Sequence, residues 1–353
     1  MVGRLCRIRE ERDSYRGANK KVPIRFLFPK IVQNATCDKA KKLPGLLETH
    51  YIRTTGAEHN QHRHQTMSTS IAQAILQGAN TLRKGGVPDE RREAGSLLMY
   101  VLERDRSYIL THAEAELSDE QVEKFIAALN ERARGKPLQY ITGRQEFFGL
   151  EFEVNSDVLI PRPETELLVE AALALVSQNG AAFICDVGTG SGCVIVTLLH
   201  KLSLARAVAL DISPAALAVA ERNATRHGVH DRLSFVTSDC FAGLGPVPGP
   251  GFDLIVSNPP YVAERAVDGL QREVRDFEPR AALVSGEDGL TVIRRLLLES
   301  GNYLKSGGVL IFEMGFDQHD AVRQLIDENS WKLLEIYHDL QGIPRTVALA
   351  KRD

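Results

Sequence analysis

The segment FICDVGTGSGCVIVTLLH, residues 183–200, joins an apolar run, a glycine-rich turn and a second apolar run of helix length. The first run is apolar enough for a strand that is covered on both faces of a sheet. Glycines in the turn let a ligand approach the backbone closely, and the start of the following helix offers free N–H groups. This order of elements predicts a ligand-binding loop at the end of a buried strand.

Strands and helices are expected to alternate from residue 180 onward. The apolar runs predicted as strands are residues 183–187, 206–210, 233–236, 252–257 and 308–312. Segments of helix length separate most of them, at residues 191–203, 213–227 and 287–305. This pattern predicts an α/β fold with a doubly wound, mostly parallel sheet. Two further runs, residues 332–337 and 345–350, are only a short turn apart and must be antiparallel, which gives a seven-stranded sheet with an antiparallel last strand.

The region before the sheet has a helical pattern. Five apolar residues share one face of the segment 88–105: Ala94, Leu97, Leu98, Val101 and Leu102. Pro88 is expected at the start of that helix, and Ser118 with Gln121 has the spacing of a capping box. We therefore predict a small all-helical domain at residues 67–145, between an extension of residues 1–66 and a sheet domain of residues 146–353.

The first residues of the sheet domain carry two further signals. Residues 146–154, EFFGLEFEV, alternate in the manner of a short hairpin or edge strand. Pro161 and Pro163 stand directly before a long apolar run, which predicts a helix.

Charge is distributed unevenly along the chain. Residues 1–66 contain 14 Lys and Arg against 6 Asp and Glu, whereas the remaining residues contain 29 against 40. An acidic body argues against a broad nucleic-acid surface, because phosphate binding needs clustered cations. The basic extension has no sustained period and is expected to be poorly ordered. Glu10, Glu11 and Asp13 disfavour a mitochondrial targeting sequence, and a true start at Met67 is an alternative of equal weight.

Composition favours a protein that stays in the cytoplasm. The 353 residues, 43% of them hydrophobic, suffice for two domains with buried cores. No run approaches the roughly 18 apolar residues of a membrane span, and the N-terminus lacks the apolar segment of a secretory signal. The cysteines are scattered and lack Cys-x-x-Cys spacing, so we expect neither disulfides nor a metal site: Cys6, Cys37, Cys185, Cys193 and Cys240.

Three loops at predicted strand ends suit an adenosine-bearing ligand. The first has Gly188, Gly190 and Gly192, but the dinucleotide fingerprint would need glycine at the next position, so NAD is disfavoured and a plain tight turn is the other interpretation. Asp211 lies 19 residues beyond Gly192, close to the interval of about 20 at which an acid receives ribose hydroxyls. The alternative role of Asp211 as a helix N-cap fits Ser213 better. Asp239 follows the third strand, where it is placed to accept a hydrogen bond from an adenine amino group.

The fourth predicted strand, residues 252–257, runs into the sequence NPPY, residues 258–261. Proline fixes φ and removes a backbone donor, so Pro259 and Pro260 form a stiff turn whose carbonyls face the ligand crevice. An ordinary Pro-Pro turn is the alternative. The coincidence with the three loops above favours a binding role.

The motifs in this order resemble those of class I S-adenosylmethionine-dependent methyltransferases that modify a planar nitrogen. Their surroundings are more specific: TGRQEFFGLEFEV, LIPRPETELLVE, SNPPYV and FEPRAALVSGEDGL, with the helical domain, resemble the HemK/PrmC family, glutamine N5-methyltransferases of peptide-chain release factors. The resemblance runs from about Met67 to Ala350. It implies that the helical domain recognises the substrate, that a release factor is the partner, and that nucleic acid is not the substrate.

The resemblance also implies the site residues. S-adenosylmethionine would be bound by the three loops and the adjoining asparagine: Gly188, Thr189, Gly190, Ser191, Gly192, Asp211, Asp239, Cys240 and Asn258. Cys240 stands where some relatives carry an aromatic residue. The glutamine of a Gly-Gly-Gln motif would be held by Asn258, Pro259, Pro260 and Tyr261, with Asn258, Pro259 and Tyr261 in catalytic roles.

Chemistry explains these residue types. An amide nitrogen is a poor nucleophile because its lone pair is delocalised. If the Asn258 oxygen and the Pro259 carbonyl each accept one amide N–H, the nitrogen is oriented toward the methyl sulfonium. The Tyr261 ring is then expected to pack on the amide plane or on the sulfonium.

Three other functions remain open. An N6-adenine nucleic-acid methyltransferase would use the same pair of hydrogen-bond acceptors, here called the clamp, on a flipped base. Such an enzyme should also carry a basic recognition region. Glutamine methylation of a ribosomal protein would share the site. A non-catalytic binding module is the least favoured, since Asn258 and the glycines are intact.

Overall fold

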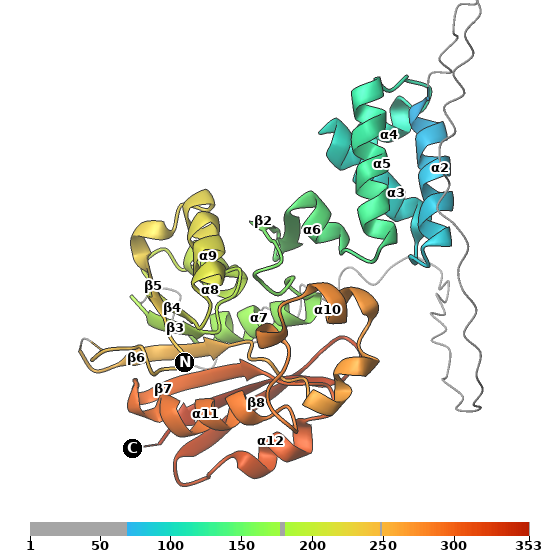
Figure 1. Ribbon diagram of the computed structural model, residues 1–353. Coiled ribbons are helices and arrows are strands. Elements are labelled where there is room, and N and C mark those ends of the chain that lie inside the picture. The colour runs from blue at the N-terminus through green and yellow to red at the C-terminus, as the bar shows by residue number, and fades with distance from the viewer. Residues whose placement is uncertain (1–68, 177–180, 248, 353) are drawn as a thin grey trace, which may run out of the picture. The chain divides into compact units, whose positions relative to one another are not determined.

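The computed structural model describes residues 69–176, 181–247 and 249–352. The predicted extension of residues 1–66 and the alternative start at Met67 lie outside the described residues. Within the described part, helices precede a seven-stranded sheet along the chain (Figure 1).

The region before the sheet is helical, as predicted. Its helices are α2 (Ile71–Lys84), α3 (Glu90–Leu102), α4 (Arg106–Thr111), α5 (Asp119–Ala133) and α6 (Leu138–Thr142). The capping box of Ser118 and Gln121 is confirmed at the start of α5. Pro88 lies in the turn before α3 and not in its first turn, because Asp89 adopts a left-handed conformation and delays the helix to Glu90.

The predicted apolar face of α3 packs into one buried cluster with α2 and α5. Ala94, Leu97 and Leu98 are fully buried, and Val101 with Leu102 lies at the margin of the cluster. After the helices, β1 (Arg144–Phe147) and β2 (Leu150–Glu153) form the predicted hairpin. Its two buried rings, Phe147 and Phe152, join the core of the sheet domain.

The sheet has the order β5-β4-β3-β6-β7-β9-β8. Its strands are β3 (Phe183–Val187), β4 (Arg206–Asp211), β5 (Leu233–Thr237), β6 (Phe252–Ser257), β7 (Leu304–Glu313), β8 (Trp331–His338) and β9 (Pro344–Lys351). β9 is antiparallel to both of its neighbours, and the pairs among β3 to β7 are parallel. The predicted topology with an antiparallel last strand is confirmed.

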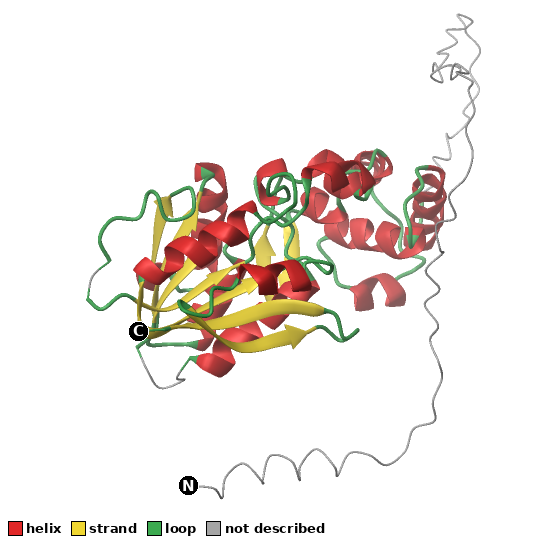
Figure 2. Ribbon diagram, turned by 90° about the horizontal axis from the view of Figure 1, so that it is seen from below, coloured by secondary structure: helices red, strands yellow, loops and turns green. Residues whose placement is uncertain are grey.

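Helices cover both faces of the sheet (Figure 2). α7 (Glu166–Leu175), α8 (Cys193–Lys201) and α9 (Pro214–Arg226) share one buried cluster with the strands. α11 (Thr291–Glu299) and α12 (His319–Leu325) share the other, and the short α10 (Arg272–Phe277) carries no buried residue. No helix in the described ranges is long and apolar enough to cross a membrane.

The predicted helix of residues 287–305 is wrong at both ends. Gly286 and Gly289 have φ values of +77° and +78°, which a helix cannot accommodate, and the Asp288 carboxylate accepts the N–H of Leu290. At the other end, β7 begins at Leu304, which pairs with Phe252 of β6. Strand pairing therefore takes residues that the sequence pattern assigns to the helix.

Candidate active site

One cavity of about 470 Å³ opens at the carboxyl ends of β3 to β6. Ten of the predicted site residues line it: Gly188, Thr189, Gly190, Ser191, Asp211, Asp239, Cys240, Asn258, Pro259 and Pro260. Gly192 and Tyr261 are not among the lining residues. The carboxyl edge of a parallel sheet is where ligands bind in open α/β folds, so the cavity is the candidate active site.

The three glycines of the first loop have two different roles. All have positive φ, but a Cβ added at Gly188 or Gly190 would meet nothing within 4 Å. A Cβ at Gly192 would lie 3.1 Å from the Ala220 Cβ, so this glycine allows α8 to pack against α9. Gly192, which was also predicted to bind the cofactor, has this packing role and is not among the residues that line the cavity.

Asp211 ends β4 and is tied to the glycine loop. One carboxylate oxygen accepts the N–H of Gly190 at 2.8 Å, and the other accepts the N–H of Ser213 at 2.9 Å. Ser213 itself caps α9 by accepting the N–H of Ala216, so Asp211 is not the helix cap. Burial raises the pKa of Asp211, whereas these backbone hydrogen bonds lower it.

Replacing Asp211 tests its part in cofactor binding. Asp211→Ala should weaken binding by about 1.5–3 kcal/mol, because a charged hydrogen-bond acceptor is lost. Calorimetric titration measures the change. Asp327→Ala is the control, since its carboxylate also accepts a backbone N–H, from Asn329, but lies outside the cavity. Equal affinities in the two variants would leave Asp211 only a loop-bracing role.

The third loop differs from the sequence-based expectation. The carboxylate of Asp239 already pairs with Arg295 on α11, with 2.6 Å between Oδ1 and Nη1. Cys240 is buried with φ +48°, and its carbonyl accepts the hydroxyl of Ser238 at 2.7 Å. Burial raises the pKa of the Cys240 thiol to about 11, so the thiol is neutral. Both residues line the cavity, but the Asp239 carboxylate has a partner that the sequence pattern did not predict.

The NPPY turn is anchored at both of its ends. The Asn258 side-chain Nδ2 donates to the Thr165 hydroxyl at 2.9 Å, and the Tyr261 carbonyl accepts from Gln318 Nε2 at 3.0 Å. Val262 then pairs with Val284 in an isolated bridge. Sequence reasoning missed Thr165 and Gln318, because neither lies within the motif that it contacts.

Tyr261, which was predicted to pack on the substrate amide or on the sulfonium, is not among the residues that line the cavity. Its pKa is raised by burial first and by the neighbouring Glu313 carboxylate second, so its hydroxyl remains protonated. The hydrogen bond between Tyr261 and Glu313 lowers the pKa of Glu313. The Tyr261 hydroxyl therefore lies beside the Glu313 carboxyl group.

Two buried carboxyl groups lie at this edge of the sheet. Burial raises the pKa of Asp186, at the end of β3, and that of Glu313, at the end of β7, to about 7 each. The hydroxyl of Thr189 donates to Asp186, and the hydroxyl of Thr165 donates to Glu313, each at 2.7 Å.

Stability should therefore decrease with rising pH. Between the ordinary pKa of 4.5 and about 7, the folded chain keeps a proton on Glu313 that the unfolded chain has lost. The free energy of unfolding should fall across this window by up to about 3 kcal/mol for this group, with the full stability present below it. Urea unfolding at pH 5 and pH 7.5 measures the slope. Glu313→Gln should flatten it, and an unchanged slope in that variant would contradict the assignment.

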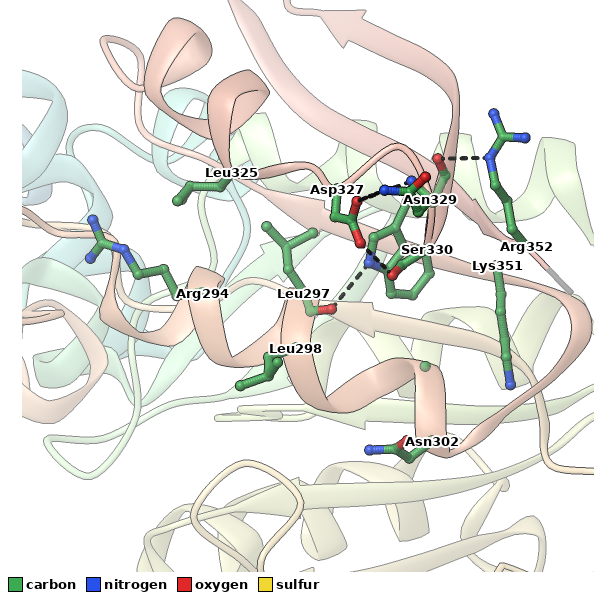
Figure 3. A pocket seen from close by; sticks show the side chains of 12 residues that line it. Arg294, Leu297, Leu298, Asn302, Leu325, Asp327, Asn329, Ser330, Lys351 and Arg352 are labelled. Atoms are coloured by element: carbon green, nitrogen blue, oxygen red, sulfur yellow. Dashed lines mark hydrogen bonds between the residues drawn. The ribbon is translucent and has the colours of Figure 1, made fainter.

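A second hollow, of about 650 Å³, lies at the opposite edge of the sheet, where β8 begins and β9 ends (Figure 3). Several of its polar groups are bonded to one another: Asp327 accepts from Asn329 and Ser330, and Arg352 donates to the carbonyl of Trp331. We assign no activity to it.

The cavity at the carboxyl edge fits a cationic ligand without phosphate. Four aspartates line it: Asp157, Asp186, Asp211 and Asp239. No lysine, arginine or histidine is among its lining residues, all of which are described. The open backbone at Gly188 and Gly190 fits a ligand that lies directly against the loop. A sulfonium nucleoside has this combination of positive charge and missing phosphate.

Comparisons with known proteins agree with this geometry. Residues 73–143 match the family model described as PrmC N-terminal domain, and residues 163–275 match the methyltransferase small domain. A release factor glutamine methyltransferase of Koribacter versatilis is 41% identical and is covered over 97% of its length by 79% of this chain. Enzymes of the same name from Nitratidesulfovibrio vulgaris and Moorella thermoacetica are 40% and 42% identical, with 79% and 72% of this chain and 96% and 89% of theirs covered.

The fold, the site and these matches define a class I methyltransferase whose cofactor is S-adenosylmethionine. Within that class, the chain belongs to the release factor glutamine methyltransferase family, also called HemK/PrmC. The expected fold and family are thus confirmed.

Proposed function

We propose that this chain transfers the methyl group of S-adenosylmethionine to the side-chain amide nitrogen (N5) of the glutamine in the Gly-Gly-Gln motif of peptide-chain release factors. The curated relatives that cover most of the chain carry this activity in their names. The observation that carries the proposal is the orientation of Asn258 beside the cavity. Its Nδ2 is engaged by Thr165, which leaves the side-chain oxygen to accept a hydrogen bond from a substrate.

The two acceptors of the clamp come from consecutive residues. The Asn258 side-chain oxygen accepts one N–H of the glutamine amide, and the Pro259 carbonyl accepts the other. With both N–H groups held, the nitrogen lone pair is directed at the methyl carbon, and a well-oriented pair of reactants removes much of the entropic barrier. The bound cofactor supplies the electrophilic methyl group.

Proton removal needs no dedicated base at the clamp. The amide becomes far more acidic once it is methylated, so its proton can pass to water. The uncharged Asn258 side chain suits this order, because it orients the amide and adds no further negative charge to the acidic cavity.

The remaining site residues have supporting roles in this proposal. Gly188, Thr189, Gly190 and Ser191 bind the methionine part of the cofactor through their backbone, Asp211 binds the ribose, and Asp239 with Cys240 lies at the adenine. Pro260 and Tyr261 keep the acceptor turn rigid. Gly192 supports the loop through its packing against Ala220.

We assign substrate recognition to the helical domain and the reaction to the sheet domain. Helix α6 ends at Thr142 and β1 starts at Arg144, and this change of element type supports a boundary at residue 145. Arg132 of α5 pairs with Glu93 of α3 and, at 2.8 Å, with Glu273 of α10. Peptide release takes place on ribosomes, so we place the enzyme in the cytoplasm.

Methyl transfer from labelled S-adenosylmethionine tests the proposal. A purified release factor should be methylated, and the same factor with the motif glutamine changed to glutamate should not. DNA and ribosomes are offered in parallel. Equal labelling of both release factors, or preferred labelling of DNA or of a ribosomal protein, would reject the release-factor substrate in favour of the alternative acceptor.

A further inference from the structure

Three side chains from distant parts of the sequence form a chain of hydrogen bonds behind the acceptor turn. Glu313 and Thr165 are each 1% exposed. The Thr165 hydroxyl donates to Glu313 Oε2 at 2.7 Å and accepts from Asn258 Nδ2 at 2.9 Å. Strand register explains the proximity: Ser257 pairs with Phe312, so the next residues, Asn258 and Glu313, emerge side by side.

The number of protons fixes the direction of this chain. A threonine hydroxyl carries one proton. An ionised Glu313 carboxylate can only accept, so it takes this proton, and Thr165 then presents only lone pairs to Asn258. The group of Asn258 that faces Thr165 must then be the NH₂, and the side-chain oxygen must face the other way.

We infer that Thr165 and Glu313 are positioning residues that hold the Asn258 amide with its oxygen toward the substrate glutamine. The inference rests on the proposed glutamine methylation. Without this pair, the amide would be free to rotate by half a turn and present its NH₂ to the substrate, where two donors would face each other. The pair therefore selects the productive one of two sterically equivalent orientations.

The surroundings of Glu313 are consistent with this role. The charged and titratable groups that act on it are Arg345 of β9, Glu164 beside Thr165, and Tyr261 of the turn. Arg345 is engaged by Asp339, with 3.0 Å between Nε and Oδ2. In the described part of the chain Glu313 forms no ion pair, so hydroxyl donors are what stabilise its carboxylate.

Isosteric substitution of Thr165 tests the inference. Thr165→Val keeps the shape and removes the hydroxyl, so kcat should fall about 10–100-fold, as expected for a misplaced reacting group. Thr165→Ser restores the hydroxyl and should restore most of kcat. The dissociation constant for S-adenosylmethionine should stay constant in both, because Thr165 acts on the acceptor side.

Thr197→Val is the matched control. Thr197 is also fully buried, but its hydroxyl has no hydrogen-bond partner and it lies outside the cavity. This variant should keep the full rate. If Thr165→Val is as active as Thr197→Val, or if Thr165→Ser is as slow as Thr165→Val in spite of normal thermal unfolding, the positioning role is wrong.

A second readout does not depend on the acceptor. In ¹⁵N spectra, the side-chain NH₂ signals of Asn258 are assigned by their loss in Asn258→Ala. Their protection from hydrogen exchange should be present in the unsubstituted chain and in Thr165→Ser, and lost in Thr165→Val. If release factor is not methylated by the unsubstituted chain, the proposed function fails, but the Asn258 NH₂ signals still test the hydrogen-bond chain. Unchanged protection of these signals in Thr165→Val would overturn the inference.

Glu313→Gln provides an independent variant in case Thr165→Val does not fold. The amide of glutamine can donate to Thr165, which then donates to the Asn258 oxygen and turns that amide around. We expect a lower kcat and altered Asn258 signals with the cofactor affinity unchanged. A full rate together with unchanged signals would count against the role of Glu313.

Discussion

Asn258→Ala lowers kcat for glutamine methylation by about 10²–10³, because one preorganised hydrogen-bond acceptor of the clamp is removed. The side chain lies at the cavity and donates a hydrogen bond to Thr165, so its loss should have little effect on folding. Cofactor affinity should barely change. Single-turnover methylation of a release factor measures the rate, and calorimetry measures the binding of S-adenosylmethionine.

Asn258→Asp separates hydrogen bonding from charge. The carboxylate keeps the shape and still accepts a hydrogen bond, but Thr165 has only one proton to share between it and Glu313. The new charge would also attract the sulfonium and displace the methyl group. We expect a slow variant with unchanged or tighter cofactor binding. A rate equal to that of the unsubstituted enzyme in Asn258→Ala would show that the clamp does not contribute to catalysis.

The sheet could be predicted because its signals are local. Each strand from β3 to β9 contains a short apolar run, and the short turn between β8 and β9 allows only antiparallel pairing. The ends of the segment 287–305 could not be predicted in the same way. There, the apolar Leu304 fits a helix and a strand equally well, and its pairing with Phe252 decides between them.

Residues of the site were likewise predictable only where their signals are local in the sequence. Motif residues that end a strand or follow it directly, such as Asp211 and Asn258, were found because position in the chain determines their place at the sheet edge. Thr165 and Gln318 reach the turn from other elements, and no spacing rule connects them to it. Glu313 did carry a usable signal, since an acid directly after a buried strand is the same feature that identified Asp211.

For Asp239, the sequence predicted the position but not the partner of the side chain. Its position after β5 was read correctly, but the partner of its carboxylate, Arg295, comes from a helix 56 residues further along the chain. Ion pairs between residues far apart in the sequence, such as this one, depend on how a helix packs over the sheet. The sequence pattern therefore locates the loop but does not predict which group the Asp239 carboxylate pairs with.

Gly190→Val should abolish binding of S-adenosylmethionine. A side chain at this position would project into open space beside the loop, where a Cβ meets no protein atom within 4 Å and where the proposed cofactor would lie. Overpacking of this kind typically costs about 1–3 kcal/mol and occasionally more, and a cost of about 3 kcal/mol or above corresponds to a loss of affinity of about 100-fold or more. Calorimetry on the folded variant should detect no binding.

Backbone strain has to be separated from this steric effect, because Gly190 has φ +55° and valine rarely adopts that conformation. Gly228→Val is the matched control: Gly228 has φ +68°, is equally open around its Cβ, and lies outside the cavity. Both variants should lose similar stability, on the order of 1–3 kcal/mol. Only Gly190→Val should lose the cofactor. The two substitutions differ chiefly in whether the new side chain faces the cavity. If both variants bind the cofactor normally, the loop does not contact the ligand. If both fail to bind it, backbone strain and not contact explains the loss.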